Sequence, residues 1–170
     1  PAADSVPAMI AAGAMISVYG PDGHRELAVE NFATAPGKTN LKEGELITSI
    51  KLPKPAERSG DAYLRMTPRT EMDIAIVGLG VALTLDSEGT VTAARVGLGA
   101  VAPTAMLVKE AGDALVGSKL DDEALERAAE ACRKACNPIN DKRGTIEYRT
   151  KIAGVLLKRV AKIAAERAGS

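Results

Sequence analysis

Two long apolar runs in the second half of the chain predict neighbouring strands of one sheet. Residues 74–86 and 91–102 each carry a strand pattern without interruption, and the polar turn 87–90 joins them. A third strand is predicted at residues 61–66, ahead of a polar loop at 68–73. These patterns together predict a three-stranded antiparallel sheet.

Three helices are predicted after these strands. Thr104 follows Pro103 and is placed to cap a helix that runs to Gly117, and Asp121 is placed to cap a second helix. The predicted buried stripe of that second helix is Leu125, Ala128, Ala129, Cys132 and Cys136. The predicted buried face of the last helix is Ile152, Val155, Leu156, Val160, Ile163 and Ala164. Strands grouped before helices indicate the α+β class, with the helices layered on one face of the sheet.

The first third of the chain predicts a short helix and a β-hairpin. The helix lies within residues 1–14, where Asp4 or Ser5 is placed to accept hydrogen bonds from its free backbone N–H groups. The turn-forming residues 21–24 separate two runs of strand character, which favours a hairpin.

A further strand and a boundary follow this hairpin. Residues 45–53 predict a strand that ends at Pro53. The next stretch, 54–61, is polar and contains proline, so it is the best candidate for a domain boundary.

Charge and hydropathy exclude several classes of function. The chain has 22 basic and 22 acidic residues and an aromatic content of 2%, so it offers little to a phosphate backbone or to stacked bases. We therefore expect no nucleic-acid binding. The longest apolar stretch, 74–85, is shorter than the roughly 20 residues that a membrane-spanning helix needs. Two cysteines without further metal-ligand partners fit a reducing, cytoplasmic setting.

The paired glycines in the two long strands resemble part of a dinucleotide-binding fingerprint. Each strand carries one Gly-x-Gly, formed by Gly78 and Gly80 and by Gly97 and Gly99. A dinucleotide site requires such glycines to end a strand and open a helix, but here the strand pattern continues through both pairs. Glycines inside a strand more often mark the close approach of another backbone, such as a helix packed across the sheet.

Three other motifs favour ordinary structure over chemistry. The run 37–39 (Gly-Lys-Thr) is not a phosphate loop, because Phe32 occupies the position of the first required glycine. Cys132 and Cys136 share one helix face and are interpreted as core residues, with a metal site as the less favoured alternative. His24 lies at the hairpin turn and is interpreted as a solvated loop residue.

Four ordered sequence blocks nevertheless resemble one protein family. The blocks are APGKTNLKEGELITSIKLP, AYLRMTPRTEMDIAIVGLGVAL, ARVGLGAVAPT and NPINDKRGTIEYRTKIAGVLLKR. The blocks are spread over nearly the whole chain, and each is similar to a segment of the FAD-carrying medium subunit of the molybdenum hydroxylases. That family includes xanthine dehydrogenase and carbon monoxide dehydrogenase.

The resemblance implies a domain organisation and a set of partners. Residues 1–57 would form the end of an FAD-binding α+β domain, and residues 58–170 the family's C-terminal domain. FAD would be shared with an upstream segment that supplies the Gly-rich pyrophosphate loops. An iron–sulfur subunit with [2Fe-2S] clusters and a subunit with the molybdenum cofactor would complete a hetero-oligomer. Electrons would pass from the clusters through FAD to NAD or another acceptor.

The resemblance also implies five residues that contact the flavin: Asp4, Ile47, Arg65, Asp73 and Ile74. Asp73 and Ile74 would lie nearest the ring, in a loop from Thr67 to Ile74 that controls access to it. No residue of this chain is expected to perform acid–base, covalent or metal chemistry, since the flavin supplies the reactivity. The alternative hypothesis is a docking or assembly domain that binds no flavin.

Overall fold

The N-terminal part of the chain is a three-stranded antiparallel sheet with one short helix. A computed structural model describes residues 3–169, so Pro1, Ala2 and Ser170 lie outside the description, including the first two residues of the predicted N-terminal helix. The sheet has the order β2-β1-β5. Its elements are α1 (Val6–Ala11), β1 (Met15–Gly20), β2 (Gly23–Ala28) and β5 (Leu46–Lys51). The hairpin predicted around residues 21–24 is confirmed, because Gly20 pairs with Gly23 across the turn.

Small elements fill the connection between β2 and β5. They are the 3-10 helix η1 (Val29–Asn31) and the two-stranded ribbon of β3 (Ala33–Ala35) and β4 (Lys38–Thr39). Gly37 forms the turn of that ribbon with a positive φ of 70°, and no helix follows it. The Gly-Lys-Thr run therefore lacks the helix N-terminus that a phosphate loop requires.

The C-terminal part is an antiparallel sheet covered by three helices. The sheet order is β6-β7-β8-β9. The strands are β6 (Ser59–Met66), β7 (Val77–Leu85), β8 (Val91–Gly99) and the two-residue β9 (Met106–Leu107). The helices are α2 (Lys109–Leu115), α3 (Asp122–Ala135) and α4 (Ile146–Gly169). The predicted α+β class and the predicted sheet of three long strands with three C-terminal helices are confirmed.

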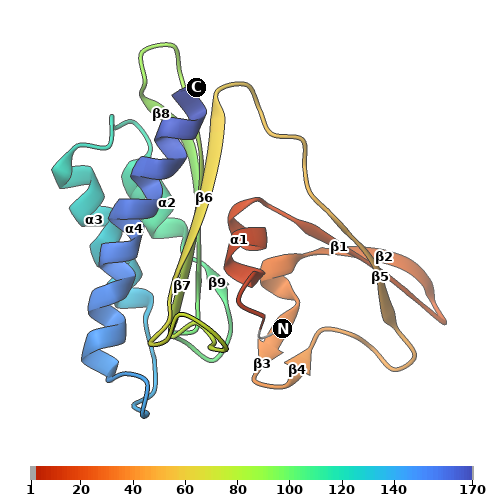
Figure 1. Cartoon of the computed structure of the whole chain (residues 1–170). Helices are drawn as coiled ribbons and strands as arrows, with labels where there is room; N and C mark the ends of the chain where they lie inside the picture. The colour runs from red at the N-terminus through yellow and green to blue at the C-terminus, as the bar shows by residue number, and fades with distance from the viewer. Residues whose placement is uncertain (1–2, 170) are drawn as a thin grey trace.

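This sheet is covered on both faces. Figure 1 shows α2, α3 and α4 on one face and α1 on the other, between the C-terminal sheet and the N-terminal one. Burial on both sides explains why the sequence of β7 is apolar along most of its length rather than alternating. The main core lies between the sheet and the three helices, and a smaller core joins α1 to β1 and β2.

Glycines allow α1 to approach the C-terminal sheet closely. A Cβ atom at Gly97 would collide with the backbone carbonyl of Pro7, and one at Gly80 would lie 2.9 Å from the same oxygen. The interpretation that these glycines mark a helix packed across the sheet is confirmed. A dinucleotide-binding turn is excluded here, because both glycines lie inside strands.

Two predicted helix details are wrong. Thr104 does not cap a helix: the chain continues as β9, where Met106 pairs with Leu98, and α2 begins at Lys109. Pairing with the edge of β8 satisfies backbone groups of β9, which the prediction had placed in a helix. The buried face of α4 is only partly as predicted: Leu156, Val160 and Ala164 are buried, but Ile152, Val155 and Ile163 are half-buried. The face is rotated toward Ala153, Leu157 and Ala161, which are fully buried. Small residues let α4 pack close to the sheet.

Local capping and the two cysteines agree with the sequence. Asp121 accepts a hydrogen bond from the Ala124 backbone N–H at 2.9 Å and caps α3 as predicted. Cys132 is fully buried, and burial raises the pKa of its thiol to about 12 and that of Cys136 to about 11. Both thiols stay protonated near neutral pH, which agrees with their interpretation as core residues. Among residues 3–169 no group of three or more His, Cys, Asp or Glu side chains is arranged to hold a metal ion.

An ion pair closes the outer end of the N-terminal sheet. Arg25 donates to both carboxylate oxygens of Glu45, at 2.8 and 2.7 Å, and the Lys42 backbone N–H donates to the same carboxylate at 2.6 Å. These bonds lower the pKa of Glu45 from its ordinary value of 4.5 to about 2.

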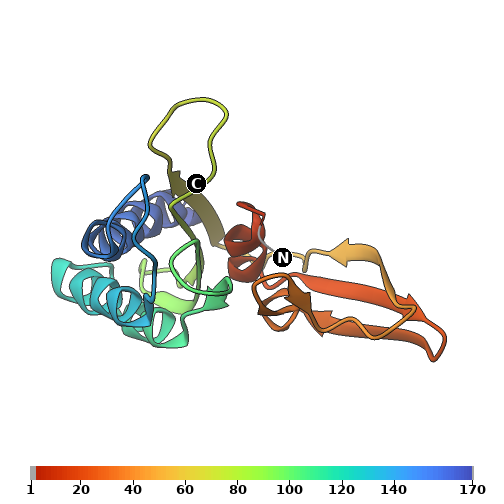
Figure 2. The same cartoon turned by 90° about the horizontal axis from the view of Figure 1, so that it is seen from below.

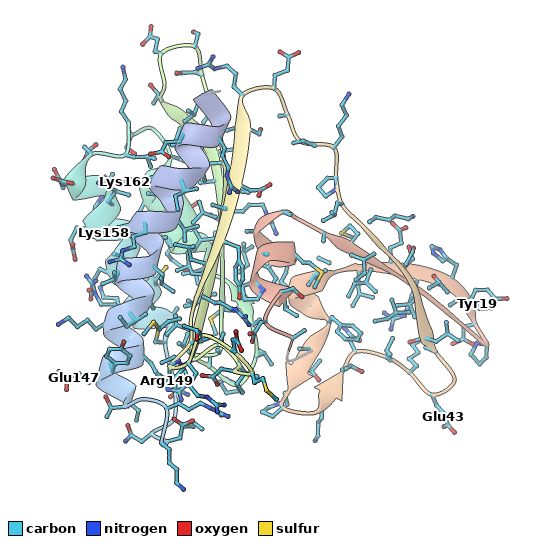
Figure 3. All side chains as sticks on the ribbon, in the orientation of Figure 1. Tyr19, Glu43, Glu147, Arg149, Lys158 and Lys162 are labelled. Atoms are coloured by element: carbon cyan, nitrogen blue, oxygen red, sulfur yellow. The ribbon has the colours of Figure 1, made fainter. Side chains whose placement is uncertain are left out.

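Glu45→Gln is therefore expected to destabilise the chain at neutral pH. A carboxylate whose pKa is lower in the folded chain than in the unfolded chain stabilises the fold fully at pH values above its unfolded-state pKa. This stabilisation is lost as the pH falls through the folded-state pKa. The difference from the unsubstituted chain should shrink between pH 4.5 and about 2, measured by urea unfolding. Glu43→Gln is the control, since Glu43 is exposed and points away from the sheet (Figure 3). A deficit that stays constant across this range would contradict the expectation.

Candidate functional site

Asp4 joins the N-terminal segment to the C-terminal sheet at the base of α1. Its carboxylate accepts hydrogen bonds from the Ala75 backbone N–H, at 3.0 and 3.2 Å, and forms an ion pair with Arg65 of β6. Its backbone carbonyl accepts a hydrogen bond of 2.5 Å from the Tyr63 hydroxyl. Asp4 is therefore not a helix cap, and Ser5 also makes no side-chain capping bond, so the predicted capping role is wrong for both.

The Asp4 site combines two opposite charges with a neutral hydroxyl. Burial, and then the negative charge of Asp4, raise the pKa of Tyr63, so the phenol stays protonated and donates. The side chain of Arg65 is 47% exposed and that of Asp4 is 25% exposed. The guanidinium of Arg65 therefore presents a positive charge beside the cleft that adjoins Asp4.

That cleft has a volume of about 520 Å³ and lies between α1, the ends of β7 and β8, and the loop before α4. Most of its lining is apolar or backbone. Its polar side chains include Asp4 at one side and Asp141, Arg143 and Arg149 at the other, and Ile74 also lines it. A mostly apolar concavity with a few charged groups is the usual form of a small-molecule or cofactor site.

Arg149 forms the polar wall of the cleft. It lies in the first turn of α4 and is only 5% exposed, and Figure 3 shows it at the end of the helix nearest the strand ends. Its guanidinium donates to Asp141 Oδ1 at 2.7 Å and to the backbone carbonyl of Ile76 at 3.3 Å. The hydrogen bond from Arg149 holds the pKa of Asp141 below its ordinary value, so this pair is ionised at neutral pH.

The loop 67–76 connects β6 to β7 beside the cleft. Figure 2 shows it projecting from the end of the C-terminal sheet. Met72 at its tip is 94% exposed with a positive φ of 50°, and Ile74 is 56% exposed. The loop therefore presents two apolar side chains to its surroundings, although it is polar in overall sequence.

Asp73 is turned into this loop. Its side chain is 2% exposed and accepts hydrogen bonds from the backbone N–H groups of Arg69, at 3.0 Å, and Ile74, at 2.9 Å. Arg69 and Arg143 lie 3.8 and 3.5 Å from its oxygens. Burial opposes ionisation, but these backbone donors and the two arginines hold the pKa of Asp73 below its ordinary value.

Ile47 lies apart from the other four predicted residues, on β5 of the N-terminal sheet. A register shift beside Ser17 places Ile47 opposite Val18 and Ile50 opposite Ile16, whose side chains are buried in the smaller core. Ile47 itself is 39% exposed, and every residue of β5 is exposed. The structure thus brings Asp4, Arg65 and Ile74 to one place, with Asp73 beside them, and leaves Ile47 on an open sheet edge.

Comparison of the chain with known proteins identifies its family. The CO dehydrogenase flavoprotein C-terminal domain matches residues 62–164, and the FAD binding domain in molybdopterin dehydrogenase matches residues 1–55. The chain belongs to the flavoprotein subunit family of the molybdenum hydroxylases. The resemblance found in the sequence is confirmed.

Individual members of the flavoprotein subunit family support the assignment. The chain is 38% identical over 156 residues to the carbon monoxide dehydrogenase medium chain of Afipia carboxidovorans, covering 92% of this chain and 54% of that one. It is 27% identical over 168 residues to the xanthine dehydrogenase FAD-binding subunit of Escherichia coli O157:H7, covering 98% and 57%. The crystal structure of a Cu,Mo-CO dehydrogenase superimposes with a TM-score of 0.91 at 36% identity, covering 96% and 57%. The chain spans about half the length of the curated relatives that it matches.

Sequence reasoning missed three polar residues of the site: Tyr63, Asp141 and Arg149. Arg149 carried a usable signal, because it lies four residues before Ala153 and so continues the buried face of α4. A charged residue in line with buried positions must find acceptors. Tyr63 gave no comparable signal, since its partner Asp4 is distant in sequence. Asp141 gave none because it lies in the loop before α4, where no helix or strand period applies.

Proposed function

We propose that the chain is the C-terminal part of a flavoprotein subunit that relays electrons from iron–sulfur clusters of a partner subunit, through FAD, to NAD or another acceptor. Substrate oxidation would take place at a molybdenum cofactor on a further subunit of the hetero-oligomer. The observation that carries the proposal is the match to the CO dehydrogenase medium chain over 92% of this chain. FAD, when bound, supplies the redox chemistry of this relay.

The domain division follows the two family matches. We propose that residues 1–57 are the end of the FAD-binding domain and 58–170 the C-terminal domain, in support of which the matched regions end at 55 and resume at 62. Residues 52–58 carry no strand or helix between β5 and β6. A cytoplasmic location is proposed from the two protonated, unpaired thiols. In the described part of the chain, no helix has the length and apolar content needed to cross a bilayer.

The residues beside the cleft suit an isoalloxazine. Ile74 lines the cleft and is an exposed aliphatic side chain that would pack on an aromatic ring system. Ile47, on the open edge of the N-terminal sheet and apart from the cleft, is a second exposed aliphatic side chain that the family resemblance assigns to the ring. Arg65 would place a positive charge near the ring and favour its reduced, negatively charged form. Asp4 would hold the position of Arg65 and of the Ala75 backbone. The cleft's apolar lining would exclude water from the ring.

One observation favours the docking alternative. Tyr19, Leu46, Ile47 and Ile50 are exposed apolar residues on β1 and β5, and Tyr19 lies at the far end of the sheet (Figure 3). An exposed apolar strand at a sheet edge is usually covered by another chain or segment. Ile47 would contact the flavin under the first hypothesis and a docked partner under the second. Its substitution therefore distinguishes them by whether FAD or a partner subunit is lost.

Ile47→Glu in the whole flavoprotein, expressed with its partner subunits, is expected to lower FAD content at least roughly tenfold, because a buried carboxylate beside the ring is unfavourable. The measurement is visible flavin absorbance per purified complex. Val116→Glu is the control, since Val116 is 45% exposed at the end of α2, away from the cleft. Full FAD content with loss of partner subunits would support the docking alternative instead.

A further inference from the structure

Among the buried polar residues of the described part of the chain, Arg149 is the one that requires the most hydrogen-bond acceptors. Its side chain donates to four acceptors: Asp141 Oδ1 at 2.7 Å, and the carbonyls of Ile76, Ala100 and Gly144 at 3.3, 3.5 and 3.4 Å. Arg149 is only 5% exposed, so each missing acceptor would leave a guanidinium donor buried and unpaired. Its environment must therefore bring all these acceptors together.

The four acceptors come from three separate segments. Ile76 ends the loop that precedes β7, Ala100 follows β8, and Asp141 and Gly144 belong to the loop before α4. Ala100 holds a positive φ of 64°, and the neighbouring Val101 carbonyl accepts the Asn137 backbone N–H at 2.7 Å. Arg149 thus lies where the ends of two strands meet the start of α4.

The same contacts hold the C-terminal end of the 67–76 loop. The Ile76 N–H donates to the Met66 carbonyl at 2.9 Å and closes the base of the loop, while the Ile76 carbonyl accepts from Arg149. Asp141 accepts the Arg143 backbone N–H at 2.8 Å, and the Arg143 side chain lies 3.5 Å from Asp73 inside the loop. Both the base of the loop and its buried carboxylate are therefore linked to the Arg149–Asp141 pair.

We infer that Arg149 is a positioning residue that, with Asp141, fixes the 67–76 loop and the wall of the adjoining cleft. Its contact with the loop is the hydrogen bond to the Ile76 carbonyl, two residues after Ile74. A lysine ammonium at this position would retain the charge but has no planar fork to serve four acceptors in different directions. The functional consequence, control of acceptor access to the flavin by this loop, rests on the proposed function.

Arg149→Lys in the whole flavin-containing complex is expected to raise hydrogen exchange of the 68–76 amides at least roughly tenfold, because local opening of the loop becomes easier. The KM for the electron acceptor should rise while kcat changes little. Asp141→Asn removes the charge of the partner and keeps its size, so it should give the same pattern more weakly. If Arg149→Lys does not fold, Asp141→Asn decides the question.

Arg133→Lys is the matched control. Arg133 packs against Gly154 of α4, but its carboxylate partners, Glu126 and Glu130, lie on α3. Unchanged loop exchange in Arg149→Lys, or an equal rise in Arg133→Lys, would overturn the inference. Faster loop exchange with unaltered flavin absorbance and acceptor KM would uphold the positioning role and count against the proposed function of the loop.

Discussion

Gly97→Ala is expected to release α1 from the C-terminal sheet and lower the free energy of unfolding by roughly 1–3 kcal/mol. The added methyl group would meet the carbonyl oxygen of Pro7, the Pro7 carbonyl carbon at 3.0 Å and the Ala11 nitrogen at 3.2 Å. All three atoms are backbone, so no side-chain rotation relieves the contact. The helix must move outward, and the Asp4 carboxylate just before α1 would move away from Ala75.

Chemical denaturation of the variant measures this loss, and the flavin content of the whole complex reports whether the Asp4 site survives. Gly169→Ala is the control, because a Cβ atom at the last residue of α4 would have no neighbour within 4 Å. A Gly97→Ala chain as stable as the Gly169→Ala chain would show that α1 does not pack as closely as the structure indicates.

Asp73→Asn is expected to loosen the 67–76 loop and raise the flavin potential in the assembled enzyme. The carboxylate accepts hydrogen bonds from two backbone N–H groups and lies between Arg69 and Arg143. An asparagine amide would point its NH2 group at one of these donors, so at least one of the hydrogen bonds would be lost. Removing the negative charge also leaves two arginines uncompensated. Their field would favour negative charge on a nearby reduced ring, which raises its potential.

The flavin potential and the rate with the terminal acceptor are the measurements, with substrate oxidation under single-turnover conditions expected to change little. The loosening of the loop by Asp73→Asn, relative to the unsubstituted chain, should disappear as the pH falls through the depressed pKa of Asp73. Below that pH the aspartic acid of the unsubstituted chain is protonated and has lost its charge as well.

Asp86→Asn provides the comparison for this variant. Asp86 accepts the backbone N–H groups of Glu88 and Thr90, at 2.9 and 2.8 Å, in the turn between β7 and β8. That turn lies at the opposite end of the sheet from the 67–76 loop (Figure 1). Asp86→Asn should lower the melting temperature without altering the flavin. If Asp73→Asn behaves in the same way, Asp73 has a structural role only.

Local patterns predicted most elements because their causes are local. The hairpin at Gly20–Gly23 follows from turn residues beside each other in sequence, and Asp121 reaches a backbone N–H three residues away. The prediction failed at Thr104, where an equally local capping signal competes with a sheet edge formed by β8. The chain pairs with β8 because this pairing satisfies the backbone N–H and C=O groups of β9. In the predicted helix, only the Thr104 side chain would have been available to the free backbone N–H groups of the first turn.

The sequence by itself determined the order of the long strands and the helices, the α+β class, the close approach at Gly97 and the family. Only the tertiary structure decided what the charged groups do. Asp4 was placed as a helix cap, yet its carboxylate bonds to Ala75, which is 71 residues away, and Arg149 bonds to Ile76 across 73 residues. A side-chain charge has several possible partners within its own segment and many beyond it. Which of them it meets depends on how the sheet and helices pack, and no period or spacing in the chain encodes that geometry.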